Sequence, residues 1–176
     1  MKHGMKVVKL TDDYVFKDFD CGNPDLNDFL LNDSKGYLKR LLSVTYLIEN
    51  EYDIVAFFSV SNDKIGIPDS DKATWRKIKS LFPHSKHRGD YPAVKIGRFG
   101  VSLKYQHSMI GSDILNFVKI MFSTGNRSGC AFVTVDALKE AVPFYQKNGF
   151  LFLDKTKDTD VNNETCLMYF DLSRLL

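Results

Sequence analysis

The stretch KYQHSMIGSDIL, residues 104–115, joins an apolar segment typical of a strand to an apolar pattern typical of a helix. The first amides of a helix have no partner within it, and the helix dipole adds partial positive charge, so such a junction can bind a diphosphate. Residues Gln106 to Ser112 occupy this place. Because Gly111 is the one glycine where phosphate loops usually hold several, an ordinary connection between strand and helix is the alternative interpretation.

A second candidate for chemistry is a group of basic residues between positions 72 and 88. Basic side chains with interleaved rings can follow an RNA backbone and stack on its bases. The alternative is a solvated helix face with Trp75 buried. The basic residues are Lys72, Arg76, Lys77, Lys79, Lys86 and Arg88, and the rings are Trp75, His84 and His87.

Composition limits the classes of protein to which the chain can belong. Its 176 residues predict a single domain over 1–176, and a net charge of +2 does not by itself require a polyanionic partner. The cysteines Cys21, Cys130 and Cys166 are odd in number and lack C-x-x-C spacing, which argues against a disulfide framework and a metal site. We see no leader-like segment and no apolar run near the roughly 18 residues of a membrane span, so we expect a cytoplasmic protein.

The elements that position these residues predict an α/β (α+β) fold, with a mixed sheet of about seven strands flanked by helices. Asn23 is a candidate N-cap before Pro24, and residues 62–92 resemble a long decorated loop around one helix. Strands are expected over 6–10, 43–48, 54–60, 93–102, 130–137, 150–154 and 165–172, and helices over 24–31, 34–41, 73–82, 110–122 and 138–148. The helix over 110–122 is supported by an apolar face of Ile110, Ile114, Phe117, Val118, Met121 and Phe122.

The segment AVPFYQKNGF, residues 141–150, fits the pattern A-x-x-F-Y-x-x-x-G-F throughout. Together with the loop that runs from Tyr105 to Gly111, it resembles the GNAT superfamily of N-acetyltransferases. The order of the expected elements is similar to that family over nearly the whole chain. The resemblance implies a mostly antiparallel sheet whose fourth and fifth strands splay apart, and acetyl-CoA as the cosubstrate.

The resemblance also implies where acetyl-CoA binds. Its pantetheine arm would bond to the backbone of strand four like an added strand, and its diphosphate would rest on amides of the loop. Gly100 in that strand indicates close approach by another group, although a bulge is an equal alternative. The implied cofactor-binding residues are Phe99, Gly100, Val101, Gln106, His107, Ser108, Met109, Ile110, Gly111 and Ser112.

This chain departs from the family where the loop usually holds inner glycines, because His107 and Met109 stand there. A backbone donor does not depend on its side chain. We therefore expect phosphate binding to persist if φ at Met109 is negative, whereas a positive φ would impose strain.

For catalysis, the resemblance implies that Tyr145 is the general acid that protonates the departing thiolate. Plain packing against Phe144 is the alternative for such a pair. We assign no general base, because Asp136 can simply cap a turn and an aminoacyl ester's amine already has a low pKa. Arg98 could contact phosphate or pair with a carboxylate.

Two further segments, FDCGNPDLNDFL and IGRFGVS, resemble a GNAT subgroup of toxins that acetylate aminoacyl-tRNA and are neutralised by a ribbon-helix-helix antitoxin. That resemblance implies tRNA and antitoxin partners, and many relatives form homodimers. An acetyltransferase of a small amine or a protein N-terminus is the alternative within enzymes, and a non-catalytic acyl-CoA-binding regulatory protein is the alternative outside them. The matching residues are Phe19, Cys21, Gly22, Leu26, Phe29, Leu30, Gly97, Arg98 and Val101.

Overall fold

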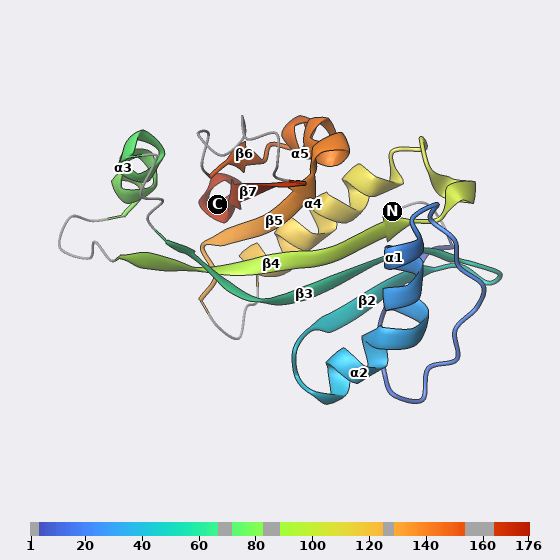
Figure 1. Ribbon diagram of the computed structural model, residues 1–176. Helices are drawn as coiled ribbons and strands as arrows, with labels where there is room; N and C mark the ends of the chain where they lie inside the picture. The colour runs from blue at the N-terminus through green and yellow to red at the C-terminus, as the bar shows by residue number, and fades with distance from the viewer. Residues whose placement is uncertain (1–3, 67–71, 83–88, 125–128, 154–163) are drawn as a thin grey trace. The chain divides into compact units, whose positions relative to one another are not determined.

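The strands form one seven-stranded, mostly antiparallel sheet in the order β1-β2-β3-β4-β5-β7-β6, in which β4 and β5 are parallel (Figure 1). This arrangement confirms the predicted fold class. The structure, a computed structural model, describes residues 4–66, 72–82, 89–124, 129–153 and 164–176. The strands are β1 (Lys6–Lys9), β2 (Val44–Glu49), β3 (Ile54–Gly66), β4 (Asp90–Val101), β5 (Phe132–Leu138), β6 (Leu151–Phe152) and β7 (Thr165–Asp171).

The helices comprise five α-helices and several short π or 3-10 turns within the described residues. The α-helices are α1 (Pro24–Asp28), α2 (Ser34–Lys39), α3 (Lys72–Ser80), α4 (Ile110–Ser123) and α5 (Val142–Lys147). The short turns are the π-helical η1 (Phe29–Asp33) and the 3-10 turns η3 (Leu103–Tyr105), η4 (Lys139–Ala141) and η6 (Leu172–Leu175).

The chain divides into two compact units, and β3, β4 and α4 each run from one unit into the other. The first unit comprises residues 1–61 and 96–118, and the second comprises residues 62–95 and 119–176. The expectation of a single domain over 1–176 stays a prediction.

In the first unit, α1 begins as the sequence predicts. The side chain of Asn23 accepts a hydrogen bond from the amide of Leu26 at 3.2 Å, and Pro24 starts the helix where no amide donor is needed. The chain continues through η1 into α2, and the apolar side chains of Phe29 and Leu30 are buried.

The strands of the first unit present two apolar faces, because successive side chains of a strand alternate between faces. Leu47 of β2 pairs with Phe57 of β3, and both belong to one cluster with Phe29 and Leu30. Helices α1 and α2, with η1 between them, therefore cover this face. On the other face, the next pair includes Phe58, whose ring lies 6.4 Å from that of Phe117 on α4.

The second unit surrounds the antiparallel pair of β5 and β7. Phe132 and Tyr169 share a cluster with Trp75 and Ile78 of α3, so α3 covers that side of the unit. The ring of Phe170, which points from β7 to the opposite face, lies 5.7 Å from the ring of Phe150.

The prediction of a long decorated loop over residues 62–92 is partly wrong. Strand β3 continues to Gly66 and β4 already starts at Asp90, so both strands extend into that segment. Lys64 and Asp90 form an ion pair at 3.0 Å between the two extensions. The segment resembled a loop because of its glycines and prolines, among them Gly66, Gly89 and Pro92.

Candidate functional site

The predicted phosphate loop, residues 106–112, lies in the first unit between η3 and α4. Gln106 to Met109 form a turn, and Ile110, Gly111 and Ser112 form the first turn of α4. The first helical bond that returns to this turn runs from the amide of Asp113 to the carbonyl oxygen of Met109, at 3.1 Å. The amides of Ile110 to Ser112 therefore precede the helical hydrogen-bond ladder, which is the arrangement that binds anions.

The backbone of the phosphate loop is left-handed at two positions that are not glycine. His107 has a φ of 58° and Met109 a φ of 65°. The negative φ at Met109 that the sequence analysis required for unstrained phosphate binding is therefore not found. A left-handed conformation costs an L-residue about 1–2 kcal/mol, so this loop holds strain that glycines would avoid.

Packing of the His107 and Met109 side chains in the core does not account for their left-handed backbone. Both are exposed, and Met109 keeps 69% of its surface accessible. The loop thus has a backbone that glycine would adopt, although its sequence lacks the glycines that usually reveal such a loop.

Gln106 connects the phosphate loop to the rest of the first unit. Its side-chain Nε2 donates to the carbonyl oxygens of Cys21 and Val101, each at 2.9 Å, and its amide donates to Ser102 at 3.1 Å. These bonds give Gln106 a supporting role in the loop. Ser108 is held in a similar way, because its hydroxyl donates to the carbonyl oxygen of Tyr105.

The electrostatics of the loop depend on backbone dipoles more than on side-chain charge. The nearby ammonium of Lys104 is paired with Asp53 at 2.8 Å. Asp113 lies in the first turn of α4, where a carboxylate interacts favourably with the helix dipole and competes with a bound anion. An anion at this loop would therefore be bound chiefly by amides.

Gly100 of β4 is explained by packing within the first unit. A Cβ atom at this position would lie 2.8 Å from Cε1 of Phe57 and 3.4 Å from Sγ of Cys21. The close approach that the sequence indicates is therefore made by the Phe57 ring. The neighbouring residues Phe99 and Val101, also expected to contact acetyl-CoA, are half-buried.

Tyr145, the predicted general acid, belongs to the second unit. It lies on α5, and Gly149 follows the helix with a φ of 83°, as the predicted helix end requires. Its ring packs edge-on against Phe144 and Phe150, with centroids at 5.2 and 5.4 Å. Burial raises the pKa of Tyr145 well above the ordinary value of 10.0, so the phenol carries its proton at neutral pH.

Lys119 is a buried group near α5 that sequence reasoning missed. Its ammonium donates to the carbonyl oxygen of Asn148, the C-cap of α5, at 2.6 Å and lies 4.2 Å from the centre of the Phe170 ring. Burial, and then the charge of Arg174, lowers the pKa of Lys119. A lysine next to the apolar face of α4 gives no sequence signal of burial, because lysine is nearly always exposed.

The two charged residues discussed above as possible catalytic or phosphate-binding groups, Asp136 and Arg98, both have charged partners in the structure. Asp136 is part of β5 and pairs with Lys95 of β4, so it does not cap a turn. Arg98 lies 3.9 Å from Asp25 and 5.3 Å from the centre of the Phe29 ring. Of the alternatives for Arg98, the structure shows the one in which it faces a carboxylate.

The basic group is represented in the described residues by α3. Lys72, Arg76 and Lys77 are exposed there, whereas Trp75 is 5% exposed and its ring lies 5.6 Å from that of Tyr91. Trp75 is therefore buried, as the alternative interpretation expected, and it is not a stacking ring. Contact of the exposed basic residues with RNA stays a prediction. His84, Lys86, His87 and Arg88 lie outside the described residues.

In the described ranges, no three His, Cys, Asp or Glu side chains are grouped so that they could bind a metal ion. The helices found in those same ranges include none that combines the length and apolar character of a membrane span.

Comparison with known proteins identifies the family. The model of the acetyltransferase (GNAT) domain family matches residues 77–163. No curated protein sequence matches the chain significantly. Among solved structures, AtaT complexed with acetyl-methionyl-tRNAfMet is similar with a TM-score of 0.77 and 19% identity, over 97% of this chain and 96% of that one.

Two further solved structures show the same likeness. A mutant AtaT toxin bound to acetyl-CoA and the C-terminus of the antitoxin AtaR has a TM-score of 0.71 and 18% identity, over 98% of this chain and 96% of that one. A tyrosine-to-phenylalanine mutant of KacT has a TM-score of 0.76 and 19% identity, over 99% and 100%. At these identities the likeness establishes the fold. The family assignment rests on the matched domain model, by which the chain belongs to the GNAT superfamily of acetyltransferases.

Proposed function

We propose that this protein is an acetyl-CoA-dependent N-acetyltransferase that acetylates the amino group of aminoacyl-tRNA, as the toxin of a toxin-antitoxin pair. The observation that carries the enzymatic part is the backbone of the phosphate loop, which places the free amides of the α4 N-terminus after a left-handed turn at 107 and 109. The choice of acceptor is supported by the likeness to AtaT complexed with acetyl-methionyl-tRNAfMet.

The residues present fit acetyl-CoA, which supplies an activated acetyl thioester. The amides from His107 to Ser112 would bind the diphosphate, since the first turn of α4 offers donors outside the helical ladder. The backbone of residues 99–101 would hold the pantetheine arm by strand-like hydrogen bonds. Gln106 would support the loop through its bonds to Cys21 and Val101.

Tyr145 would donate the proton that the departing thiolate needs. Its raised pKa keeps the phenol protonated across neutral pH, which a general acid requires before the reaction. We assign no general base in the chain. The amine of an aminoacyl ester has a lower pKa than a lysine side chain, so a useful fraction is already neutral.

The exposed basic residues of α3 would bind the phosphate backbone of tRNA. A ribbon-helix-helix antitoxin would be the protein partner, by analogy with the AtaT structures that contain AtaR. A homodimer, a cytoplasmic location and a single catalytic domain over 1–176 belong to the same proposal.

Radiolabelled acetyl-CoA, incubated with the protein and a panel of charged tRNAs, small amines and peptides, tests the acceptor. We expect label on charged tRNA, released by mild alkali as an N-acetyl amino acid. Label confined to small amines or peptide N-termini would move the assignment to the second enzymatic alternative. Binding of acetyl-CoA without any transfer would favour the regulatory protein.

A further inference from the structure

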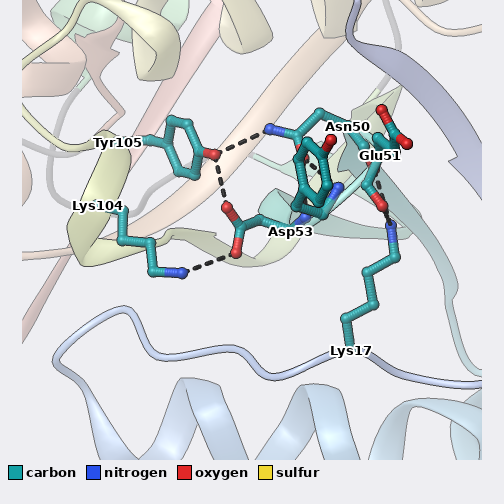
Figure 2. Close-up of polar contacts among 7 residues, drawn as sticks. Lys17, Asn50, Glu51, Asp53, Lys104 and Tyr105 are labelled. Atoms are coloured by element: carbon teal, nitrogen blue, oxygen red, sulfur yellow. Dashed lines mark hydrogen bonds and ion pairs between the residues drawn. The ribbon is translucent and has the colours of Figure 1, made fainter.

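A network of polar side chains joins the turn between β2 and β3 to the residues that enter the phosphate loop (Figure 2). All of its members belong to the first unit. The phenol of Tyr105 donates to Oδ2 of Asp53 at 2.8 Å and accepts from Nδ2 of Asn50 at 2.9 Å. The other carboxylate oxygen of Asp53 accepts from Nζ of Lys104 at 2.8 Å.

The turn that supplies Asn50 and Asp53 is itself tightly bonded. Oδ1 of Asn50 accepts from the amides of Tyr52 and Asp53 at 2.9 and 2.7 Å. From the other side, Nζ of Lys17 donates to the carbonyl oxygens of Asn50 and Glu51 at 2.8 and 3.1 Å (Figure 2). The turn therefore offers Tyr105 and Lys104 a fixed set of partners.

The phosphate loop needs such support because its backbone is unfavourable for its own residues. Left-handed His107 and Met109 persist only where the surroundings determine the conformation. Tyr105 precedes the loop directly, and its carbonyl oxygen accepts the hydroxyl of Ser108. A fixed Tyr105 thus fixes the loop at the point between its two strained residues.

The charges of Asp53 and Lys104 fit a role in supporting the phosphate loop and not in binding the anion directly. Hydrogen bonds from Lys104 and then Tyr105 lower the pKa of the Asp53 carboxyl, so Asp53 stays ionised at neutral pH. The ammonium of Lys104 is engaged by that carboxylate. Both charges are therefore satisfied by each other, and the amides of the loop remain for the ligand.

We propose that Asn50 and Asp53 are positioning residues that hold the phosphate loop, through Tyr105 and Lys104, in the conformation that binds the diphosphate of acetyl-CoA. The inference rests on the proposed function, and it assigns the turn between β2 and β3 a role in cosubstrate affinity. Loss of the network raises Kd and KM for acetyl-CoA and leaves kcat nearly unchanged.

The first test is calorimetric titration of acetyl-CoA into wild type, Tyr105→Phe and Asp53→Asn. We expect each variant to raise Kd by about tenfold, and the double variant to add little, because both changes break one network. Tyr52→Phe is the matched control, since it removes a hydroxyl from a ring of the same turn that is 77% exposed. It should bind like wild type.

A second readout follows the loop without any ligand. Amide hydrogen exchange of residues 106–112 should be faster in Tyr105→Phe than in wild type or Tyr52→Phe, with exchange in β2 and β3 unchanged. Adding Met109→Gly to Tyr105→Phe should recover part of the lost affinity, because glycine adopts a positive φ without the steric cost.

These measurements separate the positioning role from the proposed function. Unchanged acetyl-CoA affinity and unchanged loop exchange in Tyr105→Phe would overturn the inference. A fall in kcat with unchanged KM would also overturn it. Failure of the wild-type protein to bind acetyl-CoA would overturn the proposed function and the ligand named here, while the exchange data would still decide whether the network holds the loop.

Discussion

At the scale of single residues, Gly100 shows how closely the first unit packs around β4. Gly100→Ala would place a Cβ atom 2.8 Å from the fully buried ring of Phe57, which has no room to move. We expect the free energy of unfolding to fall by about 1–3 kcal/mol in urea denaturation. Gly97→Ala on the same strand is the control, because the nearest atom to its Cβ would be the carbonyl oxygen of Ser59, at an ordinary contact distance of 3.9 Å. Equal losses in the two variants would contradict the packing argument.

Tyr145→Phe tests the residue assigned to proton transfer. Loss of a general acid should lower kcat by about 10²–10⁴-fold, while Kd for acetyl-CoA stays within a factor of two or so, because the ring packing is kept. Steady-state kinetics and calorimetry measure the two quantities. Since burial raises the pKa of Tyr145, its deprotonation should not depress the wild-type rate anywhere below about pH 10. An unchanged kcat would remove Tyr145 from the mechanism.

Some of these residues were predictable from sequence and others were not. Asn23, Pro24 and Gly149 have local roles that their own chemistry dictates, and the structure places them in those roles. The positive φ at Met109 was not predictable in this way, because no glycine marks the position and no local sequence pattern indicates a left-handed backbone there. The burial of Lys119 depends on tertiary contacts.

At the scale of elements, Glu49 couples β1 and β2 to the chain before α1. Its carboxylate is buried and accepts from Tyr14 and from Lys6, the latter at 3.0 Å. Burial raises the pKa of Glu49, but the hydrogen bonds from Tyr14 and from Lys6 lower it by more, so the net pKa lies below the ordinary 4.5. The folded state thus gains stability above pH 4.5 that is lost as pH falls through the lowered pKa.

Glu49→Gln should therefore lower stability at pH 7 and flatten the decline of stability as the pH falls below the ordinary pKa of 4.5. Urea denaturation at a series of pH values measures both effects. Glu51→Gln, an exposed change in the neighbouring turn, serves as the control and should retain the wild-type profile. A Glu49→Gln profile parallel to wild type would count against the pairing.

The exposed basic residues of α3 are predicted to contact RNA, and this can be tested separately. Arg76→Gln and Lys77→Gln should each weaken binding of charged tRNA and lower the slope of log K against log salt by about 0.9 if each contacts one phosphate. Filter binding at several salt concentrations measures the slope. Lys9→Gln, an exposed lysine of β1, is the control for a simple loss of charge. Slopes equal to wild type in both α3 variants would exclude this surface.

The elements were predicted well where apolar periodicity is strong, as in α4, and less well at the ends of β3 and β4. Residues 62–66 alternate between more and less exposed positions, as a strand with one face toward solvent does. Most of them are polar or glycine, so the sequence did not indicate that β3 continues there. Pro92 usually breaks a strand, but here it is exposed and its carbonyl oxygen accepts from Ala131 at 3.0 Å. Pro92 lies near the start of β4, where a strand tolerates a proline better than in its middle.

At the scale of the whole molecule, the fold was predicted from the order of its strands and helices. The structures of AtaT and KacT align with 97% or more of this chain, although their sequences are 18–19% identical to it. Apolar patterning therefore preserves the architecture where individual residues differ. The phosphate loop belongs to the first unit and Tyr145 to the second, so variants in each unit test binding and proton transfer separately.

The central claim is that the folded chain binds acetyl-CoA, and thermal unfolding with increasing acetyl-CoA tests it most directly. A ligand that binds the folded state alone stabilises it by RT ln(1 + [L]/Kd), or about 2.7 kcal/mol at 100 times Kd. We predict a midpoint that rises steadily with acetyl-CoA and with coenzyme A, and that does not respond to adenosine. A midpoint that stays constant up to millimolar acetyl-CoA would contradict the account.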